Sequence, residues 1–316
     1  MTKQQKPTGL AKIWREIKRP FRRRQSLDAS QTQESYIQLH NQIRAIELEY
    51  KKLKIFLNNY SLGSKELLGN LEDNQDYQWV QTLRSLLVVM DVKNGHDNFV
   101  RLGRDNDGGY VMFDDFPEES IAYSFGISND VSWDVDMTSR NIDVFMYDHT
   151  ISELPESNRR FHFFRNGITG NTSQPQCKTM EEFLTKNGHK NHNNLILKMD
   201  VEGAEWDFLN QVPSGILSQF RQMVFEFHDM ARGRWDHLIF PALEKINQTH
   251  QLVHIHANNY GDVKWMGNRF LPVTFEVTYL RKSDHEFVPT SRSFPTRWDQ
   301  PCNPSLPDYA LGCWGK

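Results

Sequence analysis

The stretch NLILKMDVEGAEWDFL, residues 194–209, combines the two features on which the interpretation of this chain depends. Its apolar run, Leu195–Leu197, is typical of a buried strand, and an amphipathic segment follows after one glycine. Three carboxylates, Asp200, Glu202 and Glu205, stand within six positions where that strand ends. Either they belong to a solvated loop, or the end of a buried strand faces a ligand.

The same alternation of short apolar runs and amphipathic segments continues on both sides of this stretch. It predicts strands over 120–126, 143–149, 161–167, 194–200, 221–228, 251–257 and 271–280. It predicts helices over 130–140, 179–188, 204–212 and 235–249. Strands that alternate with helices predict an α/β fold with a mostly parallel, doubly wound sheet. No helix separates the last two strands, so we expect an antiparallel last strand at the edge of the sheet.

The segment before this α/β region has a different pattern. Apolar residues alternate at spacings of three and four, as in the seam of a coiled coil, at Tyr36, Leu39, Ile43, Ile46, Tyr50, Leu53, Leu57 and Tyr60. We expect a homo-oligomer through 36–60, and the alternative is a single helix packed on the body. The predicted organisation is a basic tail at 1–30, a coiled-coil helix at 31–62, a helical connector at 63–95, the main domain at 96–280 and an irregular tail at 281–316.

Charge is unevenly distributed along the chain. Residues 1–24 hold nine basic residues and one acidic residue, although the net charge of all 316 residues is −3. The tail therefore suits an anionic membrane surface, or it is simply solvated, and the acidic remainder argues against a nucleic-acid partner. No apolar run approaches a membrane span or a signal peptide, and three cysteines form no disulfide framework. We expect a cytoplasmic protein, and peripheral contact of its tail with the inner face of the membrane is the alternative to a solvated tail.

The ends of the predicted strands are rich in polar groups. Gly126 follows the first strand, and Asp148 lies 22 positions later, where an acid accepts hydrogen bonds from ribose hydroxyls. The stretch SFGISND at 124–130 lacks the G-x-G-x-x-G pattern for a pyrophosphate, so a cofactor without phosphates is favoured, S-adenosylmethionine rather than NAD. A turn glycine followed by an unrelated strand-end carboxylate is the alternative.

The chain resembles the FkbM family of S-adenosylmethionine-dependent methyltransferases. The resemblance covers residues 96–310 and is carried by LILKMDVEGAEWDFL, with support from RLGRDNDGGYVM, AYSFGISNDVSWD, VFMYDHTI, VFEFHD and HIHANNYG. It implies a class I methyltransferase fold with a Rossmann-like sheet, and O-methylation of hydroxyls on sugars or polyketides. The residues expected to bind the cofactor are Ser124, Phe125, Gly126, Ile127, Asp130, Asp148, His149, Gly167 and Asp200.

Methylation of a hydroxyl requires that its proton be removed, and a neutral histidine at a strand end suits this role. His228 is the first choice for the general base, with His256 next, and Asp200 and Glu202 complete the expected catalytic group. A divalent ion held by Asp200, Glu226 and His228 is the alternative activator, ranked below a histidine base. The acceptor contacts expected are Tyr110, Asn258 and Asn259. The D-G-G turn before Tyr110 belongs either to a plain hairpin or to the border of the pocket.

Two rival functions remain. Methylation of nucleic-acid bases is disfavoured, because such enzymes place Asn or Asp before Pro-Pro and an aromatic residue where this chain has Asp200-Val201-Glu202-Gly203. A non-catalytic Rossmann-like scaffold in a membrane-associated complex is the rival from another class. The function expected is O-methylation of a sugar hydroxyl of a cell-surface polysaccharide or its precursor, and the alternative acceptor is a small molecule other than a sugar.

Overall fold

The computed structural model describes residues 29–61, 75–170, 176–231, 233, 236–266 and 269–314. It divides into two compact units, Met1–Glu49 and Tyr50–Lys316. The basic tail at 1–24 lies outside the described residues. Within the described part of the chain, no helix is long and apolar enough to cross a membrane.

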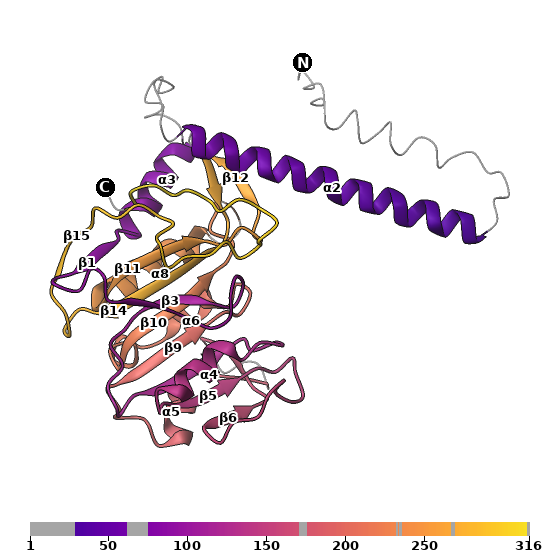
Figure 1. Cartoon of the computed structure of the whole chain (residues 1–316). Helices are drawn as coiled ribbons and strands as arrows, with labels where there is room; N and C mark the ends of the chain where they lie inside the picture. The colour runs from indigo at the N-terminus through magenta and orange to yellow at the C-terminus, as the bar shows by residue number, and fades with distance from the viewer. Residues whose placement is uncertain are drawn as a thin grey trace, which may run out of the picture. The chain divides into compact units, whose positions relative to one another are not determined.

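A seven-stranded sheet forms the centre of the second unit (Figure 1). Its strands, in spatial order, are β11 (His250–Ala257), β14 (Phe275–Arg281), β10 (Phe220–Phe227), β9 (Leu195–Met199), β4 (Ile121–Phe125), β5 (Asp143–Tyr147) and β6 (Phe161–Phe164). The five strands from β10 to β6 pair in parallel, while β14 runs antiparallel to both of its neighbours. The predicted α/β class, the mostly parallel sheet and the antiparallel last strand are therefore confirmed.

The expected position of the antiparallel strand is wrong. Strand β14 lies between β10 and β11, and the edge strand is β11. The helix α8 (Asp236–Thr249) connects β10 to β11 in the chain, but these two strands are not neighbours in the sheet. There is room for one strand between them. The last strand fills that position, and no sequence pattern distinguishes this insertion from an edge.

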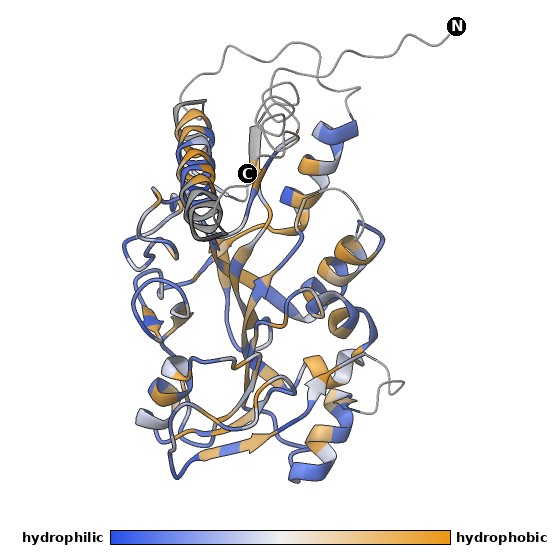
Figure 2. Cartoon of the chain, turned by 90° about the vertical axis from the view of Figure 1, so that its right-hand side faces the viewer, coloured by the Kyte–Doolittle hydropathy of each residue, from blue (hydrophilic) through white to orange (hydrophobic). Residues whose placement is uncertain are grey.

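Both faces of the sheet are covered, which explains why its strands are apolar without alternation. In β9 all five residues are buried. Leu195, Leu197 and Met199 belong to one core cluster, with residues of α3 (Gln75–Leu86), α5 (Met180–Asn187), α6 (Glu205–Gln211), α7 (Ser214–Leu217) and α8. Ile196 belongs to a second cluster, with α4 (Ser132–Ser139) and the hairpin strand β3 (Tyr110–Phe113). Figure 2 shows hydrophobic residues concentrated along the central strands.

Short strand pairs complete the fold around the sheet. The hairpin of β2 (Phe99–Leu102) and β3 contains the predicted D-G-G turn in its connection. The other pairs are β7 (Gly167–Ile168) with β8 (Cys177–Lys178), β12 (Val263–Met266) with β13 (Arg269–Pro272), and β1 (Met90–Val92) with β15 (Phe287–Pro289). The segment 281–316, expected to be irregular, contains the short strand β15. The irregular chain after β15 is packed into the core through Phe294, Leu306 and Trp314.

Candidate functional site

The site lies at the edge of the sheet where the parallel strands end. Loops after β4, β5, β9 and β10 meet there, as expected for an open α/β sheet. Gly126, directly after β4, has a φ of +78°, and a Cβ atom on it would lie 1.5 Å from the backbone oxygen of Asp200. Only glycine therefore lets the first loop pass so close to the end of β9.

A cavity of about 350 Å³ opens between these loops. Its lining consists of Phe125, Gly126, Ser128, Tyr147, Asp148, His149, Thr150, Gly167, Ile168, Asp200, Val201, Glu202 and Ala204. Six of the residues expected to bind the cofactor are present, namely Phe125, Gly126, Asp148, His149, Gly167 and Asp200. The apolar wall formed by Ile168 and Val201 was missed, because single apolar residues after a strand carry no sequence signal.

Three expected cofactor contacts do not line this cavity. Ser124 is fully buried within β4. Ile127 packs into the second core cluster, so it contributes only its backbone to the loop. Asp130 accepts hydrogen bonds from Ser132 and pairs with Arg104 at 3.3 Å, so its carboxylate is used within the loop before α4. Position in or next to the loop after β4 was not enough to predict a contact, because Ser124 and Ile127 are needed for packing and Asp130 for local hydrogen bonds.

Asp148 lines the cavity, but its carboxylate is engaged by protein groups. Oδ2 accepts hydrogen bonds from the backbone N–H groups of Ile127, at 3.0 Å, and Ser128, at 2.8 Å. Oδ1 accepts them from the backbone and the hydroxyl of Thr150. Burial would raise the pKa of Asp148, but these hydrogen bonds lower it below the usual range. The residue expected to hold a ribose is thus an anchor for the loop at 126–130, which we call the cofactor loop after the ligand expected there.

A second cavity of about 340 Å³ adjoins the first and shares Asp200 and Glu202 with it. Its remaining lining consists of Asp107, Glu226, His228, Asn258, Tyr260, Gly261 and Thr274. The expected residues Asp200, Glu202, Glu226, His228 and Asn258 all meet here. Asp107 belongs to the D-G-G turn, so the hairpin does border the pocket. Tyr110 reaches it indirectly, since its hydroxyl donates to Asp200 Oδ2 at 3.1 Å.

His228 is held in place by a buried acid. Its Nδ1 lies 3.2 Å from Oε1 of Glu205, which is fully buried and also accepts from the backbone of Val201. Its Nε2 faces Glu202, Glu226 and Asp200 at 3.6, 3.7 and 3.9 Å. Glu205, the third carboxylate after β9, therefore orients the histidine.

The surrounding carboxylates change the protonation of this histidine. Burial alone would lower the pKa of His228, but the hydrogen bond with Glu205 and the charges of Glu205, Glu226 and Asp200 raise it to about 10. A neutral His228 in this arrangement requires that the negative charge of these carboxylates be offset, and its role as general base stays a prediction. For Glu226, burial and the charge of Asp200 raise the pKa well above its usual range.

The other expected catalytic histidine, His256, does not reach either cavity. It is almost fully buried, with Nδ1 at 2.8 Å from Glu276 and Nε2 at 3.1 Å from Asp308. Asn259 is likewise buried, and its side chain exchanges hydrogen bonds with the backbone of Asn303. Both residues fasten the C-terminal segment to the sheet. Their predicted roles in base catalysis and acceptor binding are corrected accordingly.

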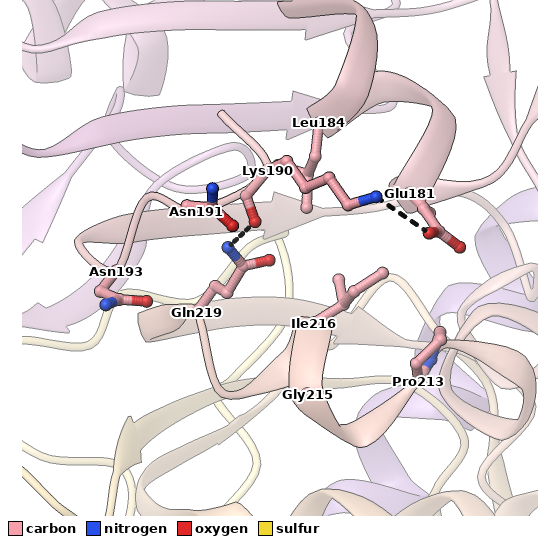
Figure 3. A pocket seen from close by; sticks show the side chains of 9 residues that line it. All are labelled: Glu181, Leu184, Lys190, Asn191, Asn193, Pro213, Gly215, Ile216 and Gln219. Atoms are coloured by element: carbon pink, nitrogen blue, oxygen red, sulfur yellow. Dashed lines mark hydrogen bonds and ion pairs between the residues drawn. The ribbon is translucent and has the colours of Figure 1, made fainter. Parts of the chain in front are cut away.

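A third cavity, of about 450 Å³, lies near the other edge of the sheet, where the chain enters β9 (Figure 3). Lys190 there pairs with Glu181 at 3.9 Å, and the amide of Gln219 donates to the backbone oxygen of Lys190. Its other lining residues are Leu184, Asn191, Asn193, Pro213, Gly215 and Ile216. It therefore brings together no acid–histidine pair, unlike the cavities at the carboxyl edge.

Comparison with protein families agrees with the location of this site. The methyltransferase FkbM domain matches residues 89–260. The chain belongs to the FkbM methyltransferase family. The FkbM match contains the cofactor loop, Asp148, Asp200 and His228, and it ends at Tyr260 in the wall of the second cavity. Among curated proteins, none matches the chain.

Proposed function

We propose that this FkbM methyltransferase uses S-adenosylmethionine to methylate a hydroxyl group of a sugar. The observation that supports this most strongly is the pair of adjoining cavities with Asp200 in the wall of both. A methyl donor in the first cavity and an acceptor in the second would meet beside this carboxylate.

The residues of the first cavity fit S-adenosylmethionine. Ile168 and Val201 supply apolar surface for a flat base, while Asp148 and Asp200 supply carboxylates. The loop at Gly126 has one glycine and no lysine, so it is not a phosphate cradle. When bound, this cofactor supplies a methyl group on a positively charged sulfur, which the carboxylate of Asp200 would attract.

The residues of the second cavity suit an acceptor with several hydroxyl groups. Carboxylates, the Asn258 side chain and the Thr274 hydroxyl offer hydrogen-bond partners, and the half-exposed Tyr260 offers a ring face. Glu226 accepts a hydrogen bond from the Asn258 amide at 2.7 Å, which fixes the orientation of both groups. Asp200 and His228 are the groups that we assign to activation of the acceptor hydroxyl.

Transfer of labelled methyl groups tests this function. The protein is incubated with methyl-labelled S-adenosylmethionine and a panel of sugars and lipid-linked glycans, and the products are analysed by mass spectrometry. We expect one added methyl group on a sugar oxygen, and transfer that is slower by a factor on the order of 10² to 10⁴ in Asp200→Asn. Methylation of a small molecule other than a sugar would show that the acceptor belongs to that other class of compound. The absence of both cofactor binding and transfer by folded protein would favour the scaffold alternative.

We also propose that the chain forms a homo-oligomer through helix α2 (Ala29–Ser61). Within the second unit, Lys51 and Lys54 of this helix donate to the backbone oxygens of Tyr260 and Val263, and Ile55 is buried. The heptad residues Ile46, Tyr50, Leu53 and Leu57 are instead between 46% and 66% exposed. An apolar seam with this spacing is typical of a helix that pairs with a second copy.

Sedimentation equilibrium tests the oligomer. The wild-type chain is expected to sediment as an oligomer and Leu53→Lys/Leu57→Lys as a monomer, with Lys52→Glu as a control on the same helix. A monomeric wild-type chain at micromolar concentration would refute this proposal.

We further propose that the protein is cytoplasmic and that residues 1–24 bring it to the inner face of the membrane. The support is their nine basic residues and interspersed apolar residues. Co-sedimentation with vesicles that contain anionic lipid should be lost when residues 1–24 are removed. Unchanged sedimentation of the truncated chain would contradict membrane contact through this tail.

A further inference from the structure

We propose that Asp200, Glu226 and His228 form a binding site for a divalent cation of the Mg²⁺ or Mn²⁺ class. The site is in the second cavity, which we call the acceptor cavity after its proposed ligand. The role of the cation in activating an acceptor rests on the proposed methyl transfer. Its binding to these three residues does not depend on that proposal.

The three side chains converge from different parts of the chain. Asp200 follows β9, Glu226 lies in β10, and His228 follows β10. One ligand atom from each lies within 4.8 Å of the other two. Ligand atoms that are about 2.1 Å from one small cation lie about 3.0 to 4.2 Å from each other. The 3.7 and 3.9 Å from Nε2 of His228 to Glu226 and Asp200 are in this range.

The histidine has the orientation of a metal ligand. Its Nδ1 is used by Glu205, and a ligating histidine usually gives its second nitrogen to such a carboxylate. Its Nε2 faces three carboxylates, and each is farther away than a hydrogen bond. The imidazole is thus held with Nε2 directed into a set of oxygen ligands.

The charge of the cavity independently favours a cation. Four carboxylates line it, from Asp107, Asp200, Glu202 and Glu226, and no lysine or arginine is among its described lining residues. The side chain of Glu226 is nine-tenths buried. Its Oε1 accepts from Asn258, and Oε2 has no hydrogen-bond partner in the described part of the chain. A buried carboxyl group with an unused oxygen, placed among other carboxylates, is suited to coordinate a metal ion, which would hold it in its charged form.

The ligand types indicate which ion is expected. Oxygen ligands select hard cations such as Mg²⁺, and one imidazole is compatible with Mn²⁺. An acceptor hydroxyl bound to the ion becomes more acidic, so its proton leaves through the exposed Glu202 to water and the oxygen keeps the electron pair for attack.

Titration of metal-stripped protein with Mn²⁺, followed by electron paramagnetic resonance, tests the site directly. We expect one bound Mn²⁺ that Mg²⁺ displaces, and an affinity about tenfold or more weaker in Glu226→Gln and in His228→Gln. Glu276→Gln is the matched control, because Glu276 belongs to the neighbouring group with His256 and Cys302. Circular dichroism confirms that each variant is folded.

The outcomes separate this inference from the proposed function. No Mn²⁺ binding by the wild-type protein at millimolar concentration would overturn the site, even if S-adenosylhomocysteine binds. Binding that is lost in Glu276→Gln but kept in Glu226→Gln would also overturn it, because the ion would then be in the neighbouring group. Mn²⁺ binding with the expected variant pattern, without S-adenosylhomocysteine binding, would support the site and contradict the methyltransferase.

Discussion

Two groups of acids and histidines lie side by side in this protein, and they differ in their access to solvent and ligands. Asp200, Glu226 and His228 line the acceptor cavity, whereas Glu276 and His256 are buried beneath the C-terminal segment. The groups are close in the sheet, because Glu226 pairs in register with Glu276, and Glu276 with His256.

The difference lies in how completely each group is hydrogen-bonded. In the buried group, both nitrogens of His256 have carboxylate partners, and Cys302 donates to Glu276 at 3.2 Å. In the open group, Nε2 of His228 faces carboxylates at 3.6 to 3.9 Å without a hydrogen bond. A buried group whose polar atoms are all paired is suited to stability, while one with unused polar atoms in a cavity is suited to chemistry.

The largest effect is expected at Asp200. Asp200→Asn keeps the size of the side chain and the partner of Tyr110, but removes the charge shared by the two cavities. Methyl transfer should fall by a factor on the order of 10² to 10⁴, while the free energy of unfolding changes by less than about 1 kcal/mol. Steady-state kinetics and urea unfolding measure the two quantities. An active Asp200→Asn variant would show that the open group is not the catalytic one.

The complementary change in the buried group should affect stability instead. His256→Gln leaves Glu276 and Asp308 without their cationic partner, and breaking a buried pair costs about 3–5 kcal/mol of unfolding free energy. The folded fraction should keep its affinity for S-adenosylhomocysteine, since His256 lines neither cavity. Glu202→Gln, an exposed change, serves as the control for stability. A fully stable but inactive His256→Gln variant would show that the buried group contributes to catalysis and not to stability.

The smallest effect is a change of stability with pH. Burial alone would lower the pKa of His256, but hydrogen bonds with Asp308, Cys302 and Glu276 raise it well above 6.5. The folded state therefore holds this proton more tightly than the unfolded state. The stabilisation is complete below about pH 6.5 and is lost as the pH rises through the folded pKa. Urea unfolding above pH 6.5 should show that the free energy of unfolding decreases with pH, and that it decreases less in His256→Gln. Equal slopes of the free energy of unfolding against pH in both proteins would contradict this role of His256.

Much of the fold was predictable because local pattern controls it. Apolar runs predicted the strands β4, β5, β6, β9, β10 and β11, and the helix predicted over 179–188 ends at Gly188, which has a left-handed conformation. The insertion of β14 was not predictable, because strand order depends on pairing between residues about fifty positions apart, as for Glu226 and Glu276.

The site was predictable in place but not in detail. His228 and His256 look alike in the sequence, since each follows or ends an apolar run. They differ through partners that are distant in the chain, such as Asp308 for His256. Asp148 shows the same limit, because its sequence position suits a ribose contact while its hydrogen bonds go to the cofactor loop. The type of residue at a strand end predicts where a site lies. The role of each residue follows only from its complete set of hydrogen-bond partners.

Calorimetric titration of the folded protein with S-adenosylhomocysteine is the most direct test of a cofactor site in the first cavity. We predict one site per chain with micromolar affinity, and weaker binding in Asp148→Ala, because the loop that Asp148 anchors through Ile127 and Ser128 forms the cavity wall. Absence of binding by the wild-type protein, with its fold verified by circular dichroism, would contradict the claim that the first cavity holds this cofactor.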